Sequence, residues 1–232
     1  MKRLIAVFLI LGVGVFIDVN MISKAQLKTT PATKTIFSIP SCFISNSDIS
    51  RYKIPSTFNN ICEDHVISNF SLINQLGDSV GIEIIENKIA IVDFFYVSCP
   101  SICPKMTSQL KRVHDHFIEN DKVMILSHTV WPEMDSVEVL LDYSLSYGAN
   151  PSKWQFLTGE KKELYRMARQ SYLVVADISD TLVKKGGELD FIHTENVVLI
   201  DPKKRIRGIY DGTSTEDVSR LLTDIDYLSK EK

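Results

Sequence analysis

Residues 89–106 of this 232-residue chain read IAIVDFFYVSCPSICPKM, and this stretch indicates how the chain folds. The dense apolar and aromatic run at 89–97 predicts a strand that is buried on both faces of a sheet. A helix is expected at about 104–117, because apolar residues recur there at helical spacing. A buried strand that leads directly into an amphipathic helix is typical of an α/β fold.

Two cysteines lie at the junction between this strand and this helix. Pro104 suits the first helical position, because its missing N–H would be unpaired there in any case. We therefore expect Cys103 at or near the N-cap and Cys99 in the loop before it, with both sulfurs near the positive end of the helix. That position favours thiolates, which attack disulfides and bind metals. A static structural disulfide is the plain alternative.

The rest of the chain continues the alternation of strands and helices. Strands are expected at 70–74, 123–129 and 154–157, a hairpin at 197–201 and 205–210, and helices at 135–147, 161–170 and 214–228. Asp135 with Glu138, and Ser214 with Asp217, have the spacing of helix caps, and Gly148 is expected to close the helix before it. This order predicts a thioredoxin-like fold: a central mixed sheet with helices on both faces, a β-hairpin and a C-terminal helix.

Composition places the chain among ordinary globular proteins. Hydrophobic residues make up 44% of it, and 26 basic against 29 acidic residues give a formal net charge of −3. This excludes a disordered chain and shows no basic surface of the kind that binds nucleic acid.

The N-terminal segment predicts export. Lys2 and Arg3 precede an uninterrupted apolar run at 4–17, so 1–25 is a signal peptide or an N-terminal membrane anchor. Residues 26–64 are interpreted as a tether and irregular lead-in, and 65–232 as one domain. Both alternatives send the chain across a membrane, and we expect the periplasmic side of the inner membrane in a bacterial cell envelope.

Residues 93–106, DFFYVSCPSICPKM, resemble the signature of the SCO/SenC family of copper-binding thioredoxin-like proteins. The similarity runs from about 65 to 228 and includes FSLINQ at 70–75, LSHTVWPEMD at 126–135, FLTG at 156–159, FIHT at 191–194 and LIDP at 199–202. The resemblance implies that Cys99, Cys103 and His193 bind copper. Two soft thiolates select Cu(I), and an imidazole can complete a trigonal site or serve Cu(II).

The chain departs from the family pattern in two respects. Ser101 stands where many members have an acidic residue, so any charge or hydrogen bond from that residue is missing. Cys42 and Cys62 lie outside the matched region, and we expect them to form a structural disulfide, with a second metal site as the alternative.

The remaining histidines have weaker signals. His114 and His116 are two apart on a helix, so they cannot chelate together and are expected to be solvated. His128 is expected to be a structural, hydrogen-bonding histidine, with an accessory metal ligand as the alternative.

The function implied by the resemblance is copper delivery to a terminal oxidase. The protein would be a metallochaperone whose partner is the copper-site subunit of cytochrome c oxidase or another cuproprotein. The alternative is an enzyme, a thiol–disulfide oxidoreductase that reduces target cysteines with Cys99 and Cys103. A thiol peroxidase on the same fold is disfavoured, because motifs around a lone peroxidatic cysteine are absent.

Overall fold

A computed structural model of the chain describes residues 65–174 and 194–231. Several predictions concern residues outside this region: the export segment 1–25, the tether 26–64, Cys42, Cys62 and His193. Within the described ranges, no helix is long and apolar enough to span a bilayer.

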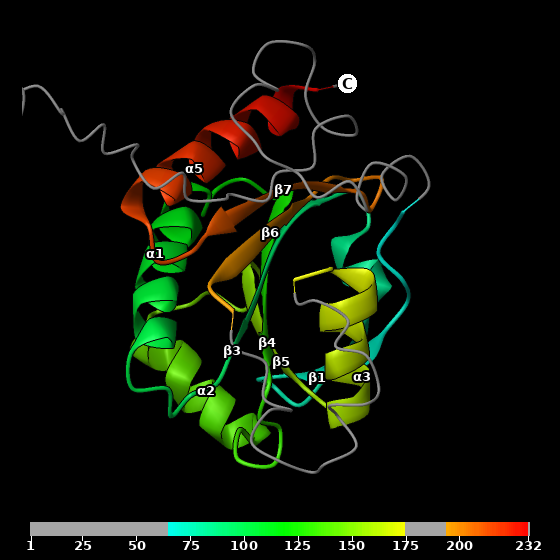
Figure 1. Cartoon of the computed structure of the whole chain (residues 1–232), viewed down its shortest axis with the longest axis vertical. Coiled ribbons are helices and arrows are strands. Elements are labelled where there is room, and N and C mark those ends of the chain that lie inside the picture. Colours follow the sequence, from blue (N-terminus) through cyan, green and yellow to red (C-terminus); the bar gives the residue numbers. More distant parts are fainter. Residues whose placement is uncertain (1–64, 175–193, 232) are drawn as a thin grey trace, which may run out of the picture. The chain divides into compact units, whose positions relative to one another are not determined.

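A seven-stranded mixed sheet forms the centre of the domain (Figure 1). Its spatial order is β2 (Ser79–Gly81), β1 (Ser71–Asn74), β5 (Trp154–Thr158), β4 (Val123–Thr129), β3 (Ile89–Phe95), β6 (Asn196–Ile200) and β7 (Ile206–Asp211). The three central strands β5, β4 and β3 are parallel, and the outer pairings are antiparallel. The predicted mixed sheet and its β6–β7 hairpin are therefore confirmed.

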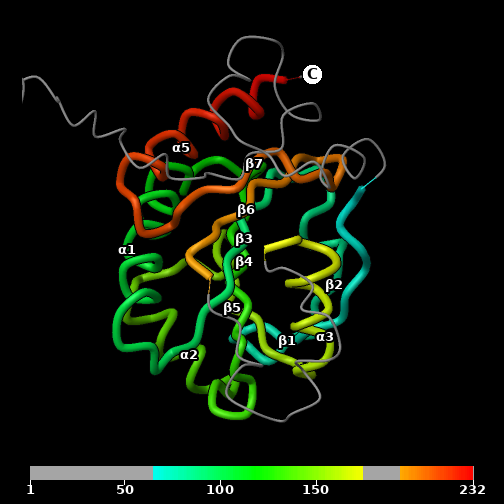
Figure 2. The backbone as a smooth tube through the Cα atoms, viewed as in Figure 1, coloured from blue at the N-terminus to red at the C-terminus, as the bar shows by residue number. Residues whose placement is uncertain are grey.

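Helices cover both faces of the sheet. On one side lie α1 (Ile102–His116), α2 (Val137–Ser146) and α5 (Thr215–Lys230); on the other lies α3 (Lys161–Arg166), which continues as a π-helical turn, Met167–Ser171 (Figures 1 and 2). The short 3-10 helix Ile82–Ile85 precedes β3.

The central strand β3 explains why two layers of helices are needed. All seven of its residues are buried, and neighbouring side chains enter opposite cores: Ile91 packs on the side of α1, and Val92 on the side of α3. Successive side chains of a strand point to opposite faces of the sheet, so a strand with apolar residues on both faces requires cover on both. The predicted α/β, thioredoxin-like architecture follows from this strand.

Two predicted helix starts were wrong by one or two residues. The N-cap of α1 is Ser101 rather than Cys103, so Pro104 is the third helical residue. Proline is tolerated there because the first four N–H groups of a helix have no partner within it. The N-cap of α2 is Ser136 rather than Asp135.

The other predicted helix ends agree better with the structure. Gly148 follows α2 with a φ of 61°, a left-handed conformation that glycine adopts without strain. At α5, the Ser214 side chain accepts a hydrogen bond from the N–H of Asp217, as expected for its cap. The helix predicted at 161–170 changes at Met167 from α-helical to π-helical geometry.

Candidate metal centre

The dithiol lies where β3 passes into α1. Cys99 is in the loop after the strand, and Cys103 is in the first turn of the helix. Both are free thiols, and both are more than nine-tenths buried. The backbone N–H of Cys103 donates a hydrogen bond to the Cys99 Sγ over 3.3 Å. The start of the helix therefore holds the two residues together with an N–H group that points at a sulfur.

The two thiols have opposite acid–base properties. Burial opposes ionisation of Cys99, but hydrogen bonds from the backbone of Ser101 and Cys103 and from the side chains of Cys103 and Tyr96 prevail and lower its pKa to about 7. Burial raises the pKa of Cys103 to about 12, and the nearby Cys99 acts in the same direction. The sequence prediction that the helix end favours both thiolates was therefore wrong for Cys103.

A buried carboxyl group, Asp93, lies on β3 on the same face of the sheet. Ser127 Oγ donates a hydrogen bond to Asp93, and Trp154 Nε1 donates to Ser127 Oγ over 2.9 Å. Burial raises the pKa of Asp93 to about 7, and its charge in turn raises the pKa of Cys103. Sequence reasoning missed this residue, although a lone acidic residue within the apolar run at 89–95 was the signal for it.

Asp135 fastens the two loops at this end of the sheet to each other. Its carboxylate accepts hydrogen bonds from the N–H of Val97, at 3.2 and 3.4 Å, and from the hydroxyl of Thr129 at the end of β4. The Thr129 Oγ1 also accepts from the N–H of Trp131 over 3.0 Å. Asp135 is thus a cross-link between the loops after β3 and β4, and not the predicted helix cap.

Tyr96 was also missed by sequence reasoning, although it adjoins the cysteine loop. Its side chain is half-buried, and its carbonyl oxygen accepts a hydrogen bond from the N–H of Cys99 over 3.3 Å. Its ring meets that of Trp131 edge-on, with centroids 5.9 Å apart.

His114 and His116 differ in environment. His116 is half exposed, as predicted. His114 is buried: its Nε2 accepts a hydrogen bond from the N–H of Asn150 over 3.1 Å, and its Nδ1 lies 2.8 Å from Asp115 Oδ1. The prediction that His114 is solvated was wrong, because a loop from beyond α2 covers it.

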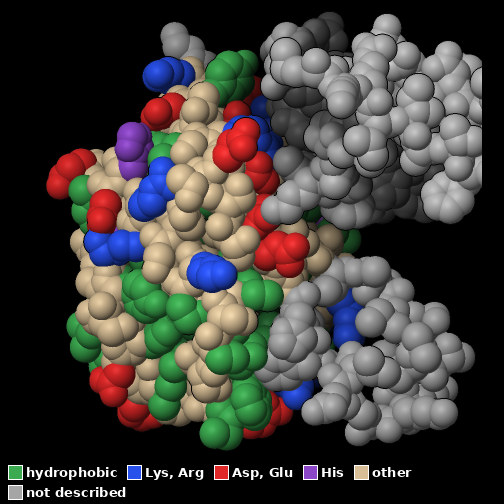
Figure 3. All heavy atoms as spheres, turned by 60° about the vertical axis from the view of Figure 1, so that its left-hand side comes forward, with side chains coloured by type: hydrophobic (Ala, Val, Ile, Leu, Met, Phe, Trp, Pro, Cys, Tyr) green, Lys and Arg blue, Asp and Glu red, His purple; other side chains and the backbone are tan. Residues whose placement is uncertain are grey.

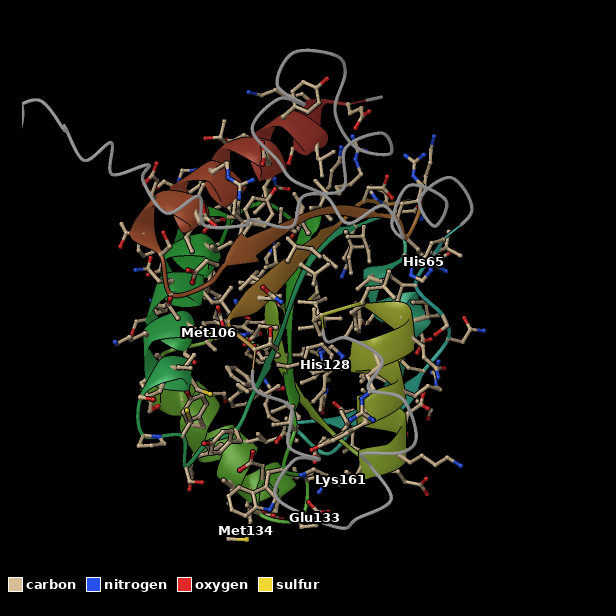
Figure 4. The ribbon with its side chains drawn as sticks, viewed as in Figure 1. His65, Met106, His128, Glu133, Met134 and Lys161 are labelled. Carbon is tan, nitrogen blue, oxygen red and sulfur yellow. The ribbon has the colours of Figure 1, made fainter. Side chains whose placement is uncertain are left out.

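His128 is a core residue on the other face of the sheet. It lies between the sheet and α3, whereas Met106 lies on the α1 side with the cysteines (Figure 4). Its ring stacks on Phe94 with centroids 5.0 Å apart, and neither ring nitrogen has a hydrogen-bond partner within the described residues. His128 is therefore structural through ring packing and not through the predicted hydrogen bonds, and the alternative of an accessory ligand gains no support from its position.

The donors available for a metal are the two sulfurs. In the part of the chain that the structure describes, no group of three or more His, Cys, Asp or Glu side chains could hold a metal ion. Cys99 and Cys103 supply two soft donors close together, which suits Cu(I). The third predicted ligand, His193, lies outside the described residues, so the three-ligand site stays a prediction.

The surface around α2 is rich in apolar side chains. Figure 3 shows hydrophobic side chains gathered over the lower part of the face that α1 and α2 form. Met134, in the loop that Asp135 fastens, is 58% exposed, and Leu145 on α2 is 64% exposed. At the edge of this region Lys161 and Glu133 form an exposed ion pair of 3.6 Å (Figure 4).

Comparison with known proteins identifies the family. A model of the SCO1/SenC family matches residues 59–228. The SCO1 protein homolog of Bacillus subtilis (strain 168) is 26% identical over 164 residues, which cover 70% of this chain and 82% of that protein.

Two solved structures agree in fold and show related sequences. BsSco, described as a member of the Sco family of cytochrome c oxidase assembly proteins, is 26% identical with a TM-score of 0.60, and the match covers 74% of this chain and 97% of that one. Arabidopsis thaliana ScoI, solved with copper bound, is 26% identical with a TM-score of 0.54 over 70% of this chain and 99% of that one. The family model spans most of the chain, and the chain therefore belongs to the SCO1/SenC family.

Proposed function

We propose that this protein is a copper-binding metallochaperone that delivers copper to, or prepares the copper site of, a respiratory terminal oxidase. The observation that carries the proposal is the pair of free thiols, Cys99 and Cys103, held together at the start of α1 by an N–H···S hydrogen bond. Two relatives support it: ScoI of Arabidopsis thaliana was solved with copper bound, and BsSco is described as a cytochrome c oxidase assembly protein.

Copper would be held by the sulfurs of Cys99 and Cys103 and the imidazole of His193. The two thiolates favour Cu(I), and the imidazole also allows Cu(II). A pKa near 12 means that Cys103 carries its proton at neutral pH, so copper binding must release that proton. Transfer would proceed by ligand exchange, in which thiolates of the target replace the three ligands in turn.

The protein would work on the periplasmic side of the bacterial inner membrane. The apolar run at 4–17 behind Lys2 and Arg3 supports a signal peptide or anchor, and the partner would be the copper-site subunit of the oxidase or another cuproprotein. Fractionation of cells, with N-terminal sequencing of the recovered protein, tests this location. Recovery of the unprocessed chain in the cytoplasm would contradict it.

The difference between the two thiols favours a second candidate function, thiol–disulfide exchange. The Cys99 thiolate would attack a target disulfide, form a mixed disulfide and release one target thiolate. The Cys103 sulfur, on losing its proton, would then attack Cys99 Sγ and release the second target thiolate, which leaves a Cys99–Cys103 disulfide. A nucleophile with a pKa near the working pH and a buried partner suit this order of events.

Anaerobic titration of the full-length chain with Cu(I) and Cu(II) tests the copper proposal. We expect one copper per chain and a thiolate-to-copper absorption band, which Cys103→Ser abolishes. His193→Ala should lose tight copper binding yet keep most of any disulfide-exchange rate, because exchange needs no distant imidazole. His116→Ala, at a half-exposed histidine on α1, is the matched control. Absence of the band in the wild type would overturn the copper proposal in favour of exchange.

A further inference from the structure

The turn between β6 and β7 has more basic than acidic side chains. Asp201, directly after β6, is buried, and its carboxylate accepts hydrogen bonds from the guanidinium groups of Arg205 and Arg207. Lys203 is exposed and Lys204 is half-buried, and neither forms an ion pair within the described residues. The arginines of the turn are therefore neutralised, whereas its two lysines keep their charge for a partner.

Two other segments of the chain meet this turn. The N–H of Ile67 donates a hydrogen bond to the carbonyl oxygen of Lys204 over 2.8 Å, so the start of the described domain lies against the turn. The end of α5 joins it as well, because Glu231 Oε2 lies 3.1 Å from Arg207 Nη1. Lys230, the residue before Glu231, is exposed. A third lysine is thus brought to the same corner of the domain.

Large apolar side chains are exposed on the same two segments. Val66 is 51% exposed, and Tyr227, one helical turn before Lys230, is 57% exposed. The acidic neighbour of Tyr227, Asp226, lies 4.0 Å from His116 on α1. The name basic corner is used below for Lys203, Lys204 and Lys230 together with Val66 and Tyr227.

We propose that the basic corner binds the anionic headgroups of a membrane surface, an inference that rests on the proposed location at the inner membrane. Lysines close to an anionic bilayer are attracted to it, and each one shifts the partitioning of a protein by about fivefold. Tyrosine and aliphatic side chains favour the boundary between headgroups and acyl chains. The whole chain has a net charge of −3, so the attraction must be local to this corner.

The kind of basic residue favours a lipid surface over a single bound phosphate. Arginine binds a phosphate with two N–H groups in a fixed geometry, but Arg205 and Arg207 already bind Asp201. The lysines that remain are mobile point charges, which suit a diffuse anionic surface. An acidic protein is the competing partner, and polyglutamate represents it in the test.

Binding through this corner would also orient the dithiol. In the antiparallel pair β3–β6, Ala90 is opposite Ile200, so the basic turn lies beside the start of β3, whereas Cys99 follows the end of β3. The seven residues of β3 separate these two ends of the sheet by about 20 Å (Figure 1). A domain that rests on the basic corner therefore presents its dithiol away from the bilayer.

Lysine acetylation of the full-length chain tests the proposal. The protein is reconstituted with vesicles of phosphatidylcholine, with or without phosphatidylglycerol, and treated with acetic anhydride, and mass spectrometry gives the rate for each lysine. Lys203, Lys204 and Lys230 should react at least about fivefold more slowly when phosphatidylglycerol is present, and high salt should remove this protection. The exposed Lys105 and Lys162 should react equally on both kinds of vesicle.

A pair of double variants separates local charge from total charge. Lys203→Gln with Lys230→Gln keeps the side-chain lengths and removes two charges, which should weaken partitioning by about 25-fold and expose Lys204 to acetylation. Lys105→Gln with Lys162→Gln removes the same charge from exposed positions elsewhere and should leave Lys204 protected.

Two results would overturn the proposal. One is equal acetylation of the three corner lysines with and without phosphatidylglycerol. The other is protection by polyglutamate, in the absence of vesicles, as strong as that by phosphatidylglycerol, which would assign the corner to an acidic protein. Failure of the wild type to associate with phosphatidylcholine vesicles would contradict the N-terminal anchor instead, while the effect of phosphatidylglycerol would still decide whether the corner binds lipid.

Discussion

The N–H of Cys103 donates to the Sγ of Cys99 over 3.3 Å, so the first turn of α1 stabilises the charge of one cysteine with the backbone of the other. The reverse does not hold, because burial, and then the nearby Cys99, raise the pKa of Cys103. The two sulfurs are therefore chemically unequal before any metal or target arrives.

This inequality predicts selective alkylation. At pH 7 about half of Cys99 is thiolate and almost none of Cys103 is, so iodoacetamide should modify Cys99 at least about 100-fold faster. Peptide mass spectrometry of the anaerobic, reduced chain measures both rates and separates them from those of Cys42 and Cys62. Labelling of Cys103 first, or at an equal rate, would contradict the assignment.

Replacing Asp93 should stabilise the protein at alkaline pH. The folded-state pKa is raised from 3.8 to about 7, so the wild type loses stability as the pH rises through 7. Asp93→Asn has no such loss and keeps an acceptor for Ser127. Its free energy of unfolding should therefore exceed that of the wild type by on the order of 4 kcal/mol at pH 8. The free energies of unfolding of the variant and the wild type should become equal below pH 4.

Urea unfolding between pH 4 and pH 8 measures this difference. Asp142→Asn, at an exposed position on α2, is the control and should follow the wild type at every pH. If the difference in free energy of unfolding between Asp93→Asn and the wild type stays constant with pH, Asp93 is not protonated in the folded state.

His128 should make the stability of the protein depend on pH in the opposite direction to Asp93. Burial lowers its pKa from 6.5 to about 4, so its contribution to stability is complete above pH 6.5 and is lost as the pH falls through 4. A phenylalanine ring suits the aromatic rings around His128. Relative to the wild type, the free energy of unfolding of His128→Phe should therefore rise by on the order of 3 kcal/mol below pH 4. Thermal or urea unfolding with His116→Phe as control tests this, and parallel stability curves for His128→Phe and wild type would refute it.

Asp135 should matter more to stability than its neighbour Glu133. Asp135→Ala leaves the N–H of Val97 and the hydroxyl of Thr129 without their acceptor, which should cost about 1–3 kcal/mol. Glu133→Ala removes only an exposed ion pair, which should cost less than about 1 kcal/mol. Equal urea midpoints for the two variants would show that the cross-link between the loops contributes little.

The fold could be predicted because its signals are local. The apolar run of β3 predicted two covered faces, and the alternation of Ile91 and Val92 between the two cores is the structural reason. The strand-to-helix position of Cys99 and Cys103 was likewise local, because it needed only the apolar run and Pro104. The start of α2 was missed by one residue, since both Asp135 and Ser136 are good N-caps.

Other properties of the site depend on partners that are remote in the sequence. Helical spacing cannot show that the N–H of Asn150 reaches His114, or that Ser127 donates to Asp93 from the next strand. The pKa of Cys103 was misjudged for the same reason, because the helix end is a local feature whereas burial is set by the packed domain. Local patterns located the dithiol, and tertiary packing made its two sulfurs differ.

The position of β3 in the sheet has a consequence for biosynthesis. Its parallel neighbour β4 follows soon after it in the chain, but its antiparallel neighbour β6 is made only near the C-terminus. Pairings between such distant segments form late, because a long loop must close first. During synthesis the two thiols therefore emerge before the core that buries them is complete.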